Sequence, residues 1–215
     1  MKIAIVTDSS AYLSTQEAEQ YNIKVVPIPV IIDNQVYEEG VDLQTAEFYE
    51  KLRNSKTFPS TSQPVLGDML KLYEDLGNEG YDTVLSIHLA STISGFYNTL
   101  VTAAPEIKSV KVVPYDSGIT VRLMGYLAIK AALMAQAGAD LADIIATLDD
   151  LKKTINEVFI VNDLQNLVRG GRLSNSAAFI GSMLKIKPLL TFDEQSNKIV
   201  AFEKVRSIKK AYKRA

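Results

Sequence analysis

The sequence predicts an α/β protein with two domains. Apolar, β-branched runs at 2–7, 83–89 and 110–114 each end in a small hydroxyl-rich loop, and a helix-forming segment follows each loop. This repeated order is typical of a mostly parallel sheet covered by helices. After residue 157, two β-forming runs joined by a short turn indicate antiparallel strands instead. We therefore expect an N-terminal α/β domain at 1–155 and a partial second α/β domain with antiparallel strands at 156–215.

Composition excludes several classes of function. The 215 residues are 47% hydrophobic, enough for one large core or two modest ones. Because 23 basic residues nearly balance 25 acidic ones, no net charge favours nucleic acid or an anionic membrane. The sequence has no cysteine and one histidine, which argues against disulfides and against a zinc site. Without a signal-peptide pattern or a run of about 18 apolar residues, we expect a cytoplasmic protein with no integral membrane contact.

The first elements follow from local signals. The strand at 2–7 ends in Thr7-Asp8-Ser9-Ser10. Ser14 and Glu17 have the spacing of a capping box, which predicts the start of a helix. The β-forming run 23–32 contains prolines at alternate positions, and their missing amide donors place it at a sheet edge.

Further helices are expected along the rest of the N-terminal domain. Asp33-Asn34 turns the chain, and a proline-bracketed loop at 59–64 places Ser62 as the cap of the following helix. Asp140 is expected to cap another helix. The expected helices are 45–55, 64–77, 96–104, 119–137 and 140–155.

The second domain is expected to contain short elements. The expected strands are 158–161, 186–192 and 199–205, and the expected helices are 163–168, 175–184 and 207–215. Ile208 and Tyr212 are spaced to form the apolar face of the last helix. The basic residues between 204 and 214 are interpreted as a solvated face, with polyanion binding as the alternative.

The loop at 86–95 is the strongest candidate binding element. It contains Ser91, Thr92, Ser94 and Gly95 and joins a predicted strand to a predicted helix. Such a loop lies at the carboxyl edge of an α/β sheet, where helix amide donors also point. It is suited to hydrogen-bond a carboxylate or a phosphate. The alternative is that Ser94 only caps its helix.

Catalytic signals are sparse. There is no nucleophile-elbow motif, and the only histidine, His88, precedes Ser94 by six residues on the predicted strand. We interpret His88 as a packed or loop-facing strand residue rather than a general base. No phosphate-binding glycine motif is present. The pattern favours binding over turnover, and the alternative is a hydrolase or phosphotransferase acting on a small anionic substrate at the same loops.

Six motifs together resemble the DegV family. They are Thr7-Asp8-Ser9-Ser10, Pro59-Ser60-Thr61-Ser62-Gln63-Pro64, Ser91 to Gly95, Tyr115-Asp116-Ser117, Arg169-Gly170-Gly171-Arg172-Leu173-Ser174, and Leu184-Lys185-Ile186-Lys187-Pro188-Leu189-Leu190. Their order and spacing match the family over residues 1–190. The family comprises fatty-acid-binding carriers that work with a bacterial fatty acid kinase. Phe96 departs from the family, because many members have threonine there. Members are usually longer, and we interpret the chain as truncated at its C-terminus.

The resemblance implies a non-enzymatic lipid carrier without a cofactor. It implies that a long-chain fatty acid is buried between the domains, with its carboxylate held by Thr61, Ser62, Ser94 and Gly95. A separate ATP-binding kinase subunit would phosphorylate the acid, and the acyl phosphate would enter phospholipid synthesis. Positions implied to contact the ligand or partner are Arg172, Arg169, Ser91, Thr92 and His88.

The fatty-acid tail would need an apolar lining. About 14 methylenes at ~0.8 kcal/mol each provide on the order of 11 kcal/mol of gross burial energy. Candidates for the lining are Ile93, Phe96, Leu123, Phe179, Ile180, Met183 and Leu184. Ordinary core packing is the alternative role for each of these residues.

Overall fold

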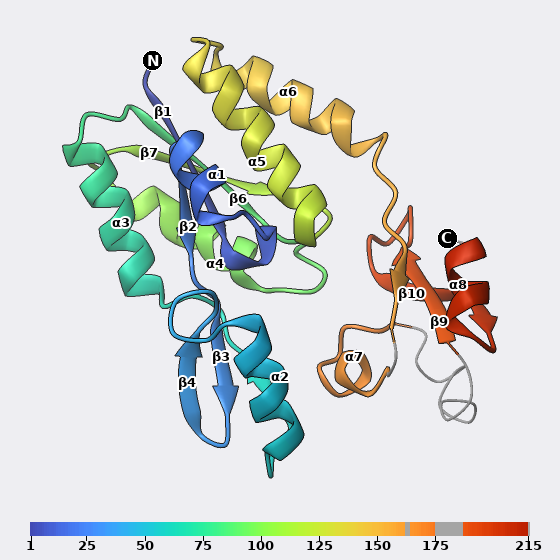
Figure 1. The fold of residues 1–215 in the computed structure, drawn as a ribbon. Coiled ribbons are helices and arrows are strands. Elements are labelled where there is room, and N and C mark those ends of the chain that lie inside the picture. Colours follow the sequence, from blue (N-terminus) through green and yellow to red (C-terminus); the bar gives the residue numbers. More distant parts are fainter. Residues whose placement is uncertain (162–163, 175–186, 215) are drawn as a thin grey trace. The chain divides into compact units, whose positions relative to one another are not determined.

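The computed structural model describes residues 1–161, 164–174 and 187–214 (Figure 1). These residues belong to two compact units, Met1–Lys153 and Thr154–Ala215. Each unit is described by itself below. No helix within the described ranges has the length and apolar character needed to cross a membrane.

A four-stranded parallel sheet forms the centre of the larger unit. Its strand order is β2 (Ile23–Val26), β1 (Ile3–Asp8), β6 (Thr83–His88) and β7 (Lys111–Asp116). All three pairings are parallel, so the carboxyl ends of the strands share one edge. Every residue of β1 and β6 is buried, as expected for central strands covered on both faces. The predicted parallel, helix-covered sheet is confirmed.

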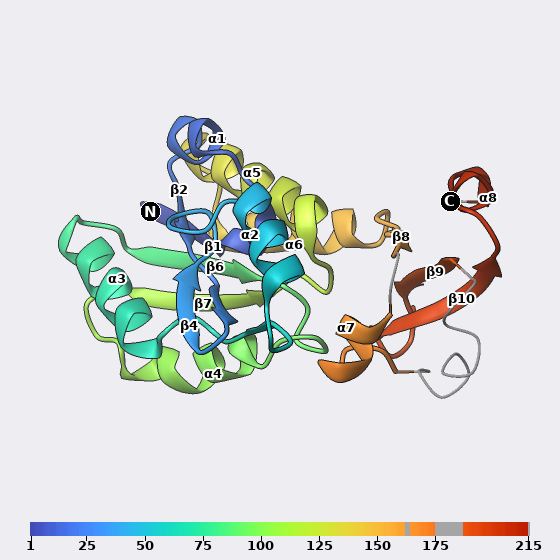
Figure 2. The ribbon, with the colours of Figure 1, turned by 60° about the horizontal axis from the view of Figure 1, so that its bottom comes forward.

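Helices cover both faces of this sheet (Figures 1 and 2). On one face, α3 (Leu66–Asn78) and α4 (Phe96–Ala103) pack against the sheet through a core that includes Tyr73, Phe96 and Leu100. On the other, α5 (Val121–Gln136) packs against β1, and α6 (Leu141–Lys152) packs against α5 and bonds to β7 through Asp149 and Lys152. This unit also contains α1 (Thr15–Gln20), η1 (Ser9–Ala11) and η2 (Ala104–Glu106), as well as α2 (Thr45–Asn54), which is described below with a second sheet.

Two predicted helix caps have different outcomes. The capping box of α1 is confirmed, because the Glu17 amide donates to Ser14 Oγ at 3.2 Å and the Ser14 amide donates to Glu17 Oε2 at 2.9 Å. Asp140 is the N-cap residue of α6, but its side chain makes no capping hydrogen bond. The predicted side-chain cap of α6 is therefore wrong.

A small antiparallel sheet projects from the same unit, with strand order β4 (Gln35–Glu38), β3 (Pro29–Ile32) and β5 (Ser60–Thr61). Helix α2 (Thr45–Asn54) follows β4. The run 23–32 was expected to be a single edge segment, and this expectation is only half right. Its first part is the edge strand β2, whereas β3 pairs on both sides. Asp33 and Asn34 have φ values of 48° and 65°, which close a β3–β4 hairpin.

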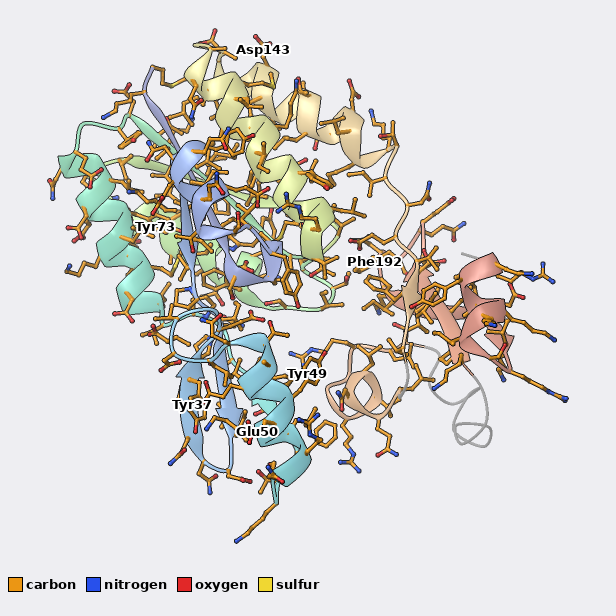
Figure 3. The ribbon with its side chains drawn as sticks, in the orientation of Figure 1. Tyr37, Tyr49, Glu50, Tyr73, Asp143 and Phe192 are labelled. Atoms are coloured by element: carbon orange, nitrogen blue, oxygen red, sulfur yellow. The ribbon has the colours of Figure 1, made fainter. Side chains whose placement is uncertain are left out.

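The smaller unit contains an antiparallel sheet of β10 (Ile199–Val205), β9 (Lys187–Phe192) and β8 (Phe159–Ile160). This pairing confirms the antiparallel strands predicted there. Phe159 on β8 meets Phe192 on β9 edge to face, with 5.7 Å between ring centroids; Phe192 is labelled in Figure 3. Helix α7 (Gln165–Arg169) lies between β8 and β9 in the chain.

The last helix, α8 (Ile208–Arg214), uses a different face from the predicted one. Ala211 is fully buried against Leu189 and Val205. Ile208 is 39% exposed and Tyr212 is 71% exposed. The small alanine lets the helix approach the sheet closely, so the predicted Ile208–Tyr212 face is wrong.

Candidate functional site

The loops that follow β6 and β7 are tied together at the carboxyl edge of the parallel sheet. The Ser117 amide donates to the carbonyl of His88 at 3.0 Å, and the Ala90 amide donates to the carbonyl of Ile119 at 2.9 Å. The Ser91 amide donates to Asp116 Oδ1 at 3.2 Å. These bonds hold the β6 loop against the β7 loop.

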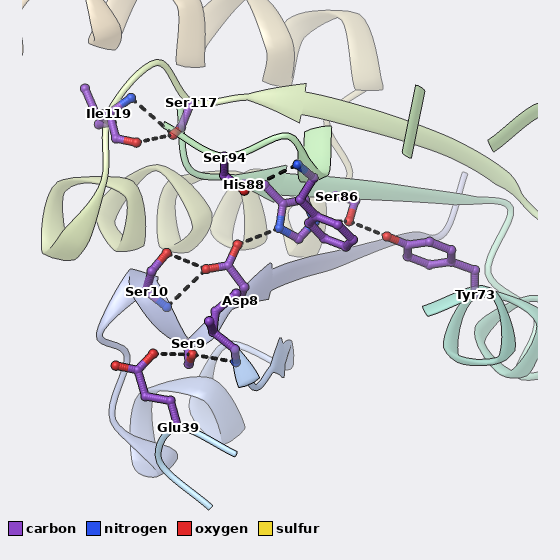
Figure 4. A network of polar contacts seen from close by, with 12 residues as sticks. Asp8, Ser9, Ser10, Glu39, Tyr73, Ser86, His88, Ser94, Ser117 and Ile119 are labelled. Carbon is purple, nitrogen blue, oxygen red and sulfur yellow. Dashed lines mark hydrogen bonds and ion pairs between the residues drawn. The ribbon is translucent and has the colours of Figure 1, made fainter. Parts of the chain in front are cut away.

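A buried chain of polar side chains runs beneath these loops (Figure 4). His88 Nδ1 lies 2.7 Å from Asp8 Oδ2, and His88 Nε2 lies 2.8 Å from Ser86 Oγ. Ser86 Oγ in turn lies 2.8 Å from the hydroxyl of Tyr73 on α3. Burial raises the pKa of the Tyr73 hydroxyl above its ordinary value. The chain is fully buried and satisfied, so it rigidifies the sheet edge.

Asp8, His88 and Ser86 stand in the order and at the distances of a catalytic triad. A triad needs a nucleophile that a substrate can reach, as in the exposed serine of a nucleophile elbow. Ser86 is instead fully buried in the middle of a central strand, and its hydroxyl is also hydrogen-bonded to the hydroxyl of Tyr73. The arrangement is therefore structural, and the interpretation of His88 as a packed strand residue is confirmed. Its position leaves no surface for direct ligand contact.

The first turn of α4 rests on this buried chain. The ring of Phe96 meets the His88 imidazole edge to face, with 4.7 Å between centroids. Phe96 is fully buried in a core that it shares with Met69 and Tyr73. It therefore has the alternative role that was given for the lining candidates, ordinary core packing. Its backbone amide donates to Ser94 Oγ at 3.3 Å. The buried histidine thereby supports the residue that follows Ser94 and Gly95.

The proline-bracketed loop 59–64 approaches the same helix start. Thr61 belongs to β5 and pairs with Val30. Ser62 continues this pairing, because its amide donates to the carbonyl of Pro29 at 3.1 Å, and its hydroxyl donates to the carbonyl of Gln63 at 3.1 Å. The predicted Ser62 cap is wrong: α3 begins after Val65 without a side-chain cap. Pro64 restrains the residue before it to an extended conformation, which suits a strand rather than a helix start.

Gln63 makes the contact between the two loops, although no local sequence signal marks it as a site residue. Thr99 on α4 donates from Oγ1 to Gln63 Oε1 at 3.0 Å. A Cβ added to Gly95 would lie 2.8 Å from Gln63 Nε2. Thr61 is two residues before Gln63, at most about 7 Å along an extended chain. Gln63 therefore holds loop 59–64, which carries Thr61, against the helix start that carries Ser94 and Gly95.

Three donors at this junction have no acceptor among the described residues: the hydroxyls of Thr61 and Ser94, and the amide of Gly95. Hydroxyls and an amide at the start of a helix are suited to an anionic oxygen ligand. Groups of three or more histidine or acidic residues arranged to hold a metal ion are absent from the described parts of the chain. The chemistry of this junction is donation of hydrogen bonds.

The other expected site residues have separate positions. The Ser91 amide donates a hydrogen bond to Asp116. Thr92 and Ile93 are partly exposed in the same loop. In the smaller unit, Arg172 Nη1 donates to the carbonyl of Gly170 at 2.9 Å, and Arg169 is exposed at the end of α7. Four lining candidates (Phe179, Ile180, Met183 and Leu184) and the expected helix 175–184 lie outside the described residues.

Fold and site together define an α/β protein with a donor-rich junction at the carboxyl edge of a parallel sheet. Comparison with known proteins then identifies its family. A family model described as "Uncharacterised protein, DegV family" matches residues 2–215. A DegV domain-containing protein, lin2658, from Listeria innocua is 48% identical over 213 residues, which are 99% of this chain and 75% of the relative. The chain belongs to the DegV family.

Solved structures agree with this assignment. The chain superposes on DegV from Bacillus subtilis, described as a fatty acid binding protein, with a TM-score of 0.90 and 44% identity. It matches the fatty acid binding DegV family protein SAG1342 from Streptococcus agalactiae with a TM-score of 0.90 and 41% identity. Each match covers 100% of this chain and 75% of the solved chain. The chain thus spans about three quarters of the length of these relatives.

Proposed function

We propose that this chain binds a long-chain fatty acid and holds its carboxylate at the junction of loop 59–64 with the start of α4. The observation that carries the proposal is the set of three donors for which the described residues offer no acceptor: Thr61 Oγ1, Ser94 Oγ and the Gly95 amide. Similarity to DegV proteins described as fatty acid binding supports the choice of ligand. Ser62, whose hydroxyl is used within its own loop, shapes the loop around Thr61.

The carboxylate and the tail of the acid contribute differently to its binding. Each buried methylene contributes about 0.8 kcal/mol, so a long tail dominates affinity. A hydrogen bond to a charged group contributes about 1.5–3 kcal/mol, and three donors fix where the two carboxylate oxygens lie. The tail therefore determines whether the acid is retained, and the junction determines which oxygen is presented.

We further propose that a separate ATP-binding kinase subunit phosphorylates the presented oxygen, in the cytoplasm, to give an acyl phosphate for phospholipid synthesis. The sequence contains no phosphate-binding glycine motif of its own, which is consistent with a separate source of ATP. Arg172 and Arg169, with Ser91 and Thr92, are the residues we assign to contact with the ligand or with this partner. No cofactor is required in this scheme.

The first experiment is mass spectrometry of the purified protein after denaturation. We expect about one fatty acid per chain, released only on unfolding. The second adds the partner kinase and ATP and measures acyl phosphate by trapping with hydroxylamine. A protein that carries no acid and takes up none when offered contradicts the binding proposal. Turnover of acyl esters or phosphates by the chain alone would instead support an enzyme.

A further inference from the structure

Among the described side chains of loop 59–64, only Gln63 contacts both Gly95 and Thr99 at the start of α4. The Thr99 hydroxyl donates to Gln63 Oε1 at 3.0 Å, which fixes the orientation of the side-chain amide. The amide nitrogen, Nε2, then faces Gly95. A Cβ added to Gly95 would lie only 2.8 Å from this nitrogen. Nε2 has no acceptor among the described residues.

From this arrangement we infer that Gln63 is the positioning residue of the junction and its fourth donor. Resting on the proposed function, this inference specifies how the carboxylate is held. Gln63 ties the strand that carries Thr61 to the helix start that carries Ser94, so the two hydroxyls keep a fixed separation. Its Nε2 amide donates to the same carboxylate as Thr61 and Ser94.

The inference also explains glycine at position 95. Gly95 has φ −73° and ψ −4°, an ordinary helical conformation that alanine adopts without strain. Glycine is therefore not needed for the backbone at this position. It is needed for space, because a Cβ would displace the Gln63 amide from its place over Gly95. Since the obstacle is the end of a flexible side chain, Gly95→Ala moves Gln63 while the fold is retained.

The test measures the pKa of the bound carboxyl group, using palmitic acid labelled with ¹³C at C1 and followed by NMR through a pH titration. Donors to the carboxylate lower this pKa, so losing one raises it. We expect Gln63→Ala, Thr99→Val and Gly95→Ala each to raise it by about half a unit or more. Gln63→Glu keeps an acceptor for Thr99 but replaces the donor by a like charge, and should raise it most.

A double variant tests whether Gly95 acts through Gln63. Once Gln63 is alanine, Gly95→Ala should raise the pKa no further, because the side chain it displaces is already absent. The matched control is Gly67→Ala, also in the first turn of a helix, where an added Cβ meets nothing within 4 Å. It should leave the pKa of the bound carboxyl unchanged.

The outcomes separate the two proposals. If the unmodified protein binds the labelled acid and Gln63→Ala leaves its pKa unchanged, the role of Gln63 is overturned and the proposed function stands. Additive effects of Gly95→Ala and Gln63→Ala would overturn the coupling between them. If the unmodified protein takes up no labelled acid, both proposals are overturned together.

Discussion

His88 Nδ1 lies 2.7 Å from Asp8 Oδ2, although the two residues are 80 positions apart in the sequence. Both side chains are fully buried. Asp8 also accepts a hydrogen bond from the Ser10 amide at 3.0 Å and one from the Ser10 hydroxyl. The pair therefore joins the loop after β1 to the strand that leads into the loop of Ser94.

Shortening the chain of buried polar groups should destabilise the protein in graded steps. His88→Ala removes the buried partner of Asp8 Oδ2, one of the two partners of Ser86, and the ring under Phe96. We expect it to lower the free energy of unfolding by about 3 kcal/mol or more. Tyr73→Phe removes only the terminal hydroxyl and should cost about 1 kcal/mol. Urea unfolding measures both values.

The control for these substitutions is Tyr97→Phe on α4. The hydroxyl of Tyr97 makes no hydrogen bond in the described part of the structure, and its loss should change the free energy of unfolding by less than about 0.5 kcal/mol. Equal effects of Tyr73→Phe and Tyr97→Phe would show that the link from Ser86 to Tyr73 contributes nothing.

The ion pair between Glu17 and Arg122 should make stability depend on pH in the acid range. A hydrogen bond from Arg122, assisted by Ser14, lowers the pKa of Glu17 from 4.5 to about 2. A lowered carboxyl pKa stabilises the folded state above the unfolded value, and this stabilisation is lost as the pH falls toward the folded value. Glu17→Gln should therefore be less stable than the unmodified protein above about pH 4.5, with the difference vanishing by about pH 2.

Urea unfolding between pH 2 and 7 follows this difference. Glu74→Gln is the control, because Glu74 is exposed on α3 and forms no ion pair among the described residues. The stability of this variant should parallel that of the unmodified protein throughout the range. A Glu17→Gln curve that also runs parallel would mean that the Arg122 pair is broken in solution.

Val121 at the start of α5 has a φ of 50°, which is unusual for a β-branched residue. The left-handed conformation costs an L-residue about 1–2 kcal/mol, and asparagine tolerates it best after glycine. Val121→Asn should therefore raise the free energy of unfolding by about 1 kcal/mol, measured by urea or thermal unfolding. The same substitution at Val101, an exposed position inside α4, should be nearly neutral or slightly destabilising. Equal effects at the two positions would contradict strain at Val121.

Local signals in the sequence were sufficient for most of the parallel sheet. The strands β1, β6 and β7 and the capping box at Ser14 depend on neighbours in the sequence, and each was predicted. The predicted cap at Ser62 failed because its amide pairs with Pro29, more than 30 residues away. Partners at such distances follow from the fold rather than from local pattern.

The candidate site shows the same division. Its hydroxyls could be named from their place after strands and before helices. The contact of Gln63 with Thr99 could not, since it depends on how β5 packs beside α4. The pairing of His88 with Asp8 could not be predicted either, because the local sequence around a strand histidine is the same whether or not its ring contacts a carboxylate.

The final prediction concerns Thr61 and Ser94 together. The double variant Thr61→Ala with Ser94→Ala removes two donors that have no acceptor in the described part of the chain and leaves the core intact, so the fold should be retained. We expect retention of the acid to weaken by about a hundredfold or more, because two bonds to the charged carboxylate are lost at about 1.5–3 kcal/mol each, while the tail still provides most of the affinity. Phosphorylation by the partner kinase should fall further, since the carboxylate oxygens are no longer oriented. Thr102→Ala serves as the control, because its hydroxyl bonds to the carbonyl of Asn98 on the same helix and to no other described residue. Mass spectrometry of retained acid and hydroxylamine trapping measure the two effects, and unchanged phosphorylation in the double variant would refute the assignment of these two hydroxyls to the carboxylate.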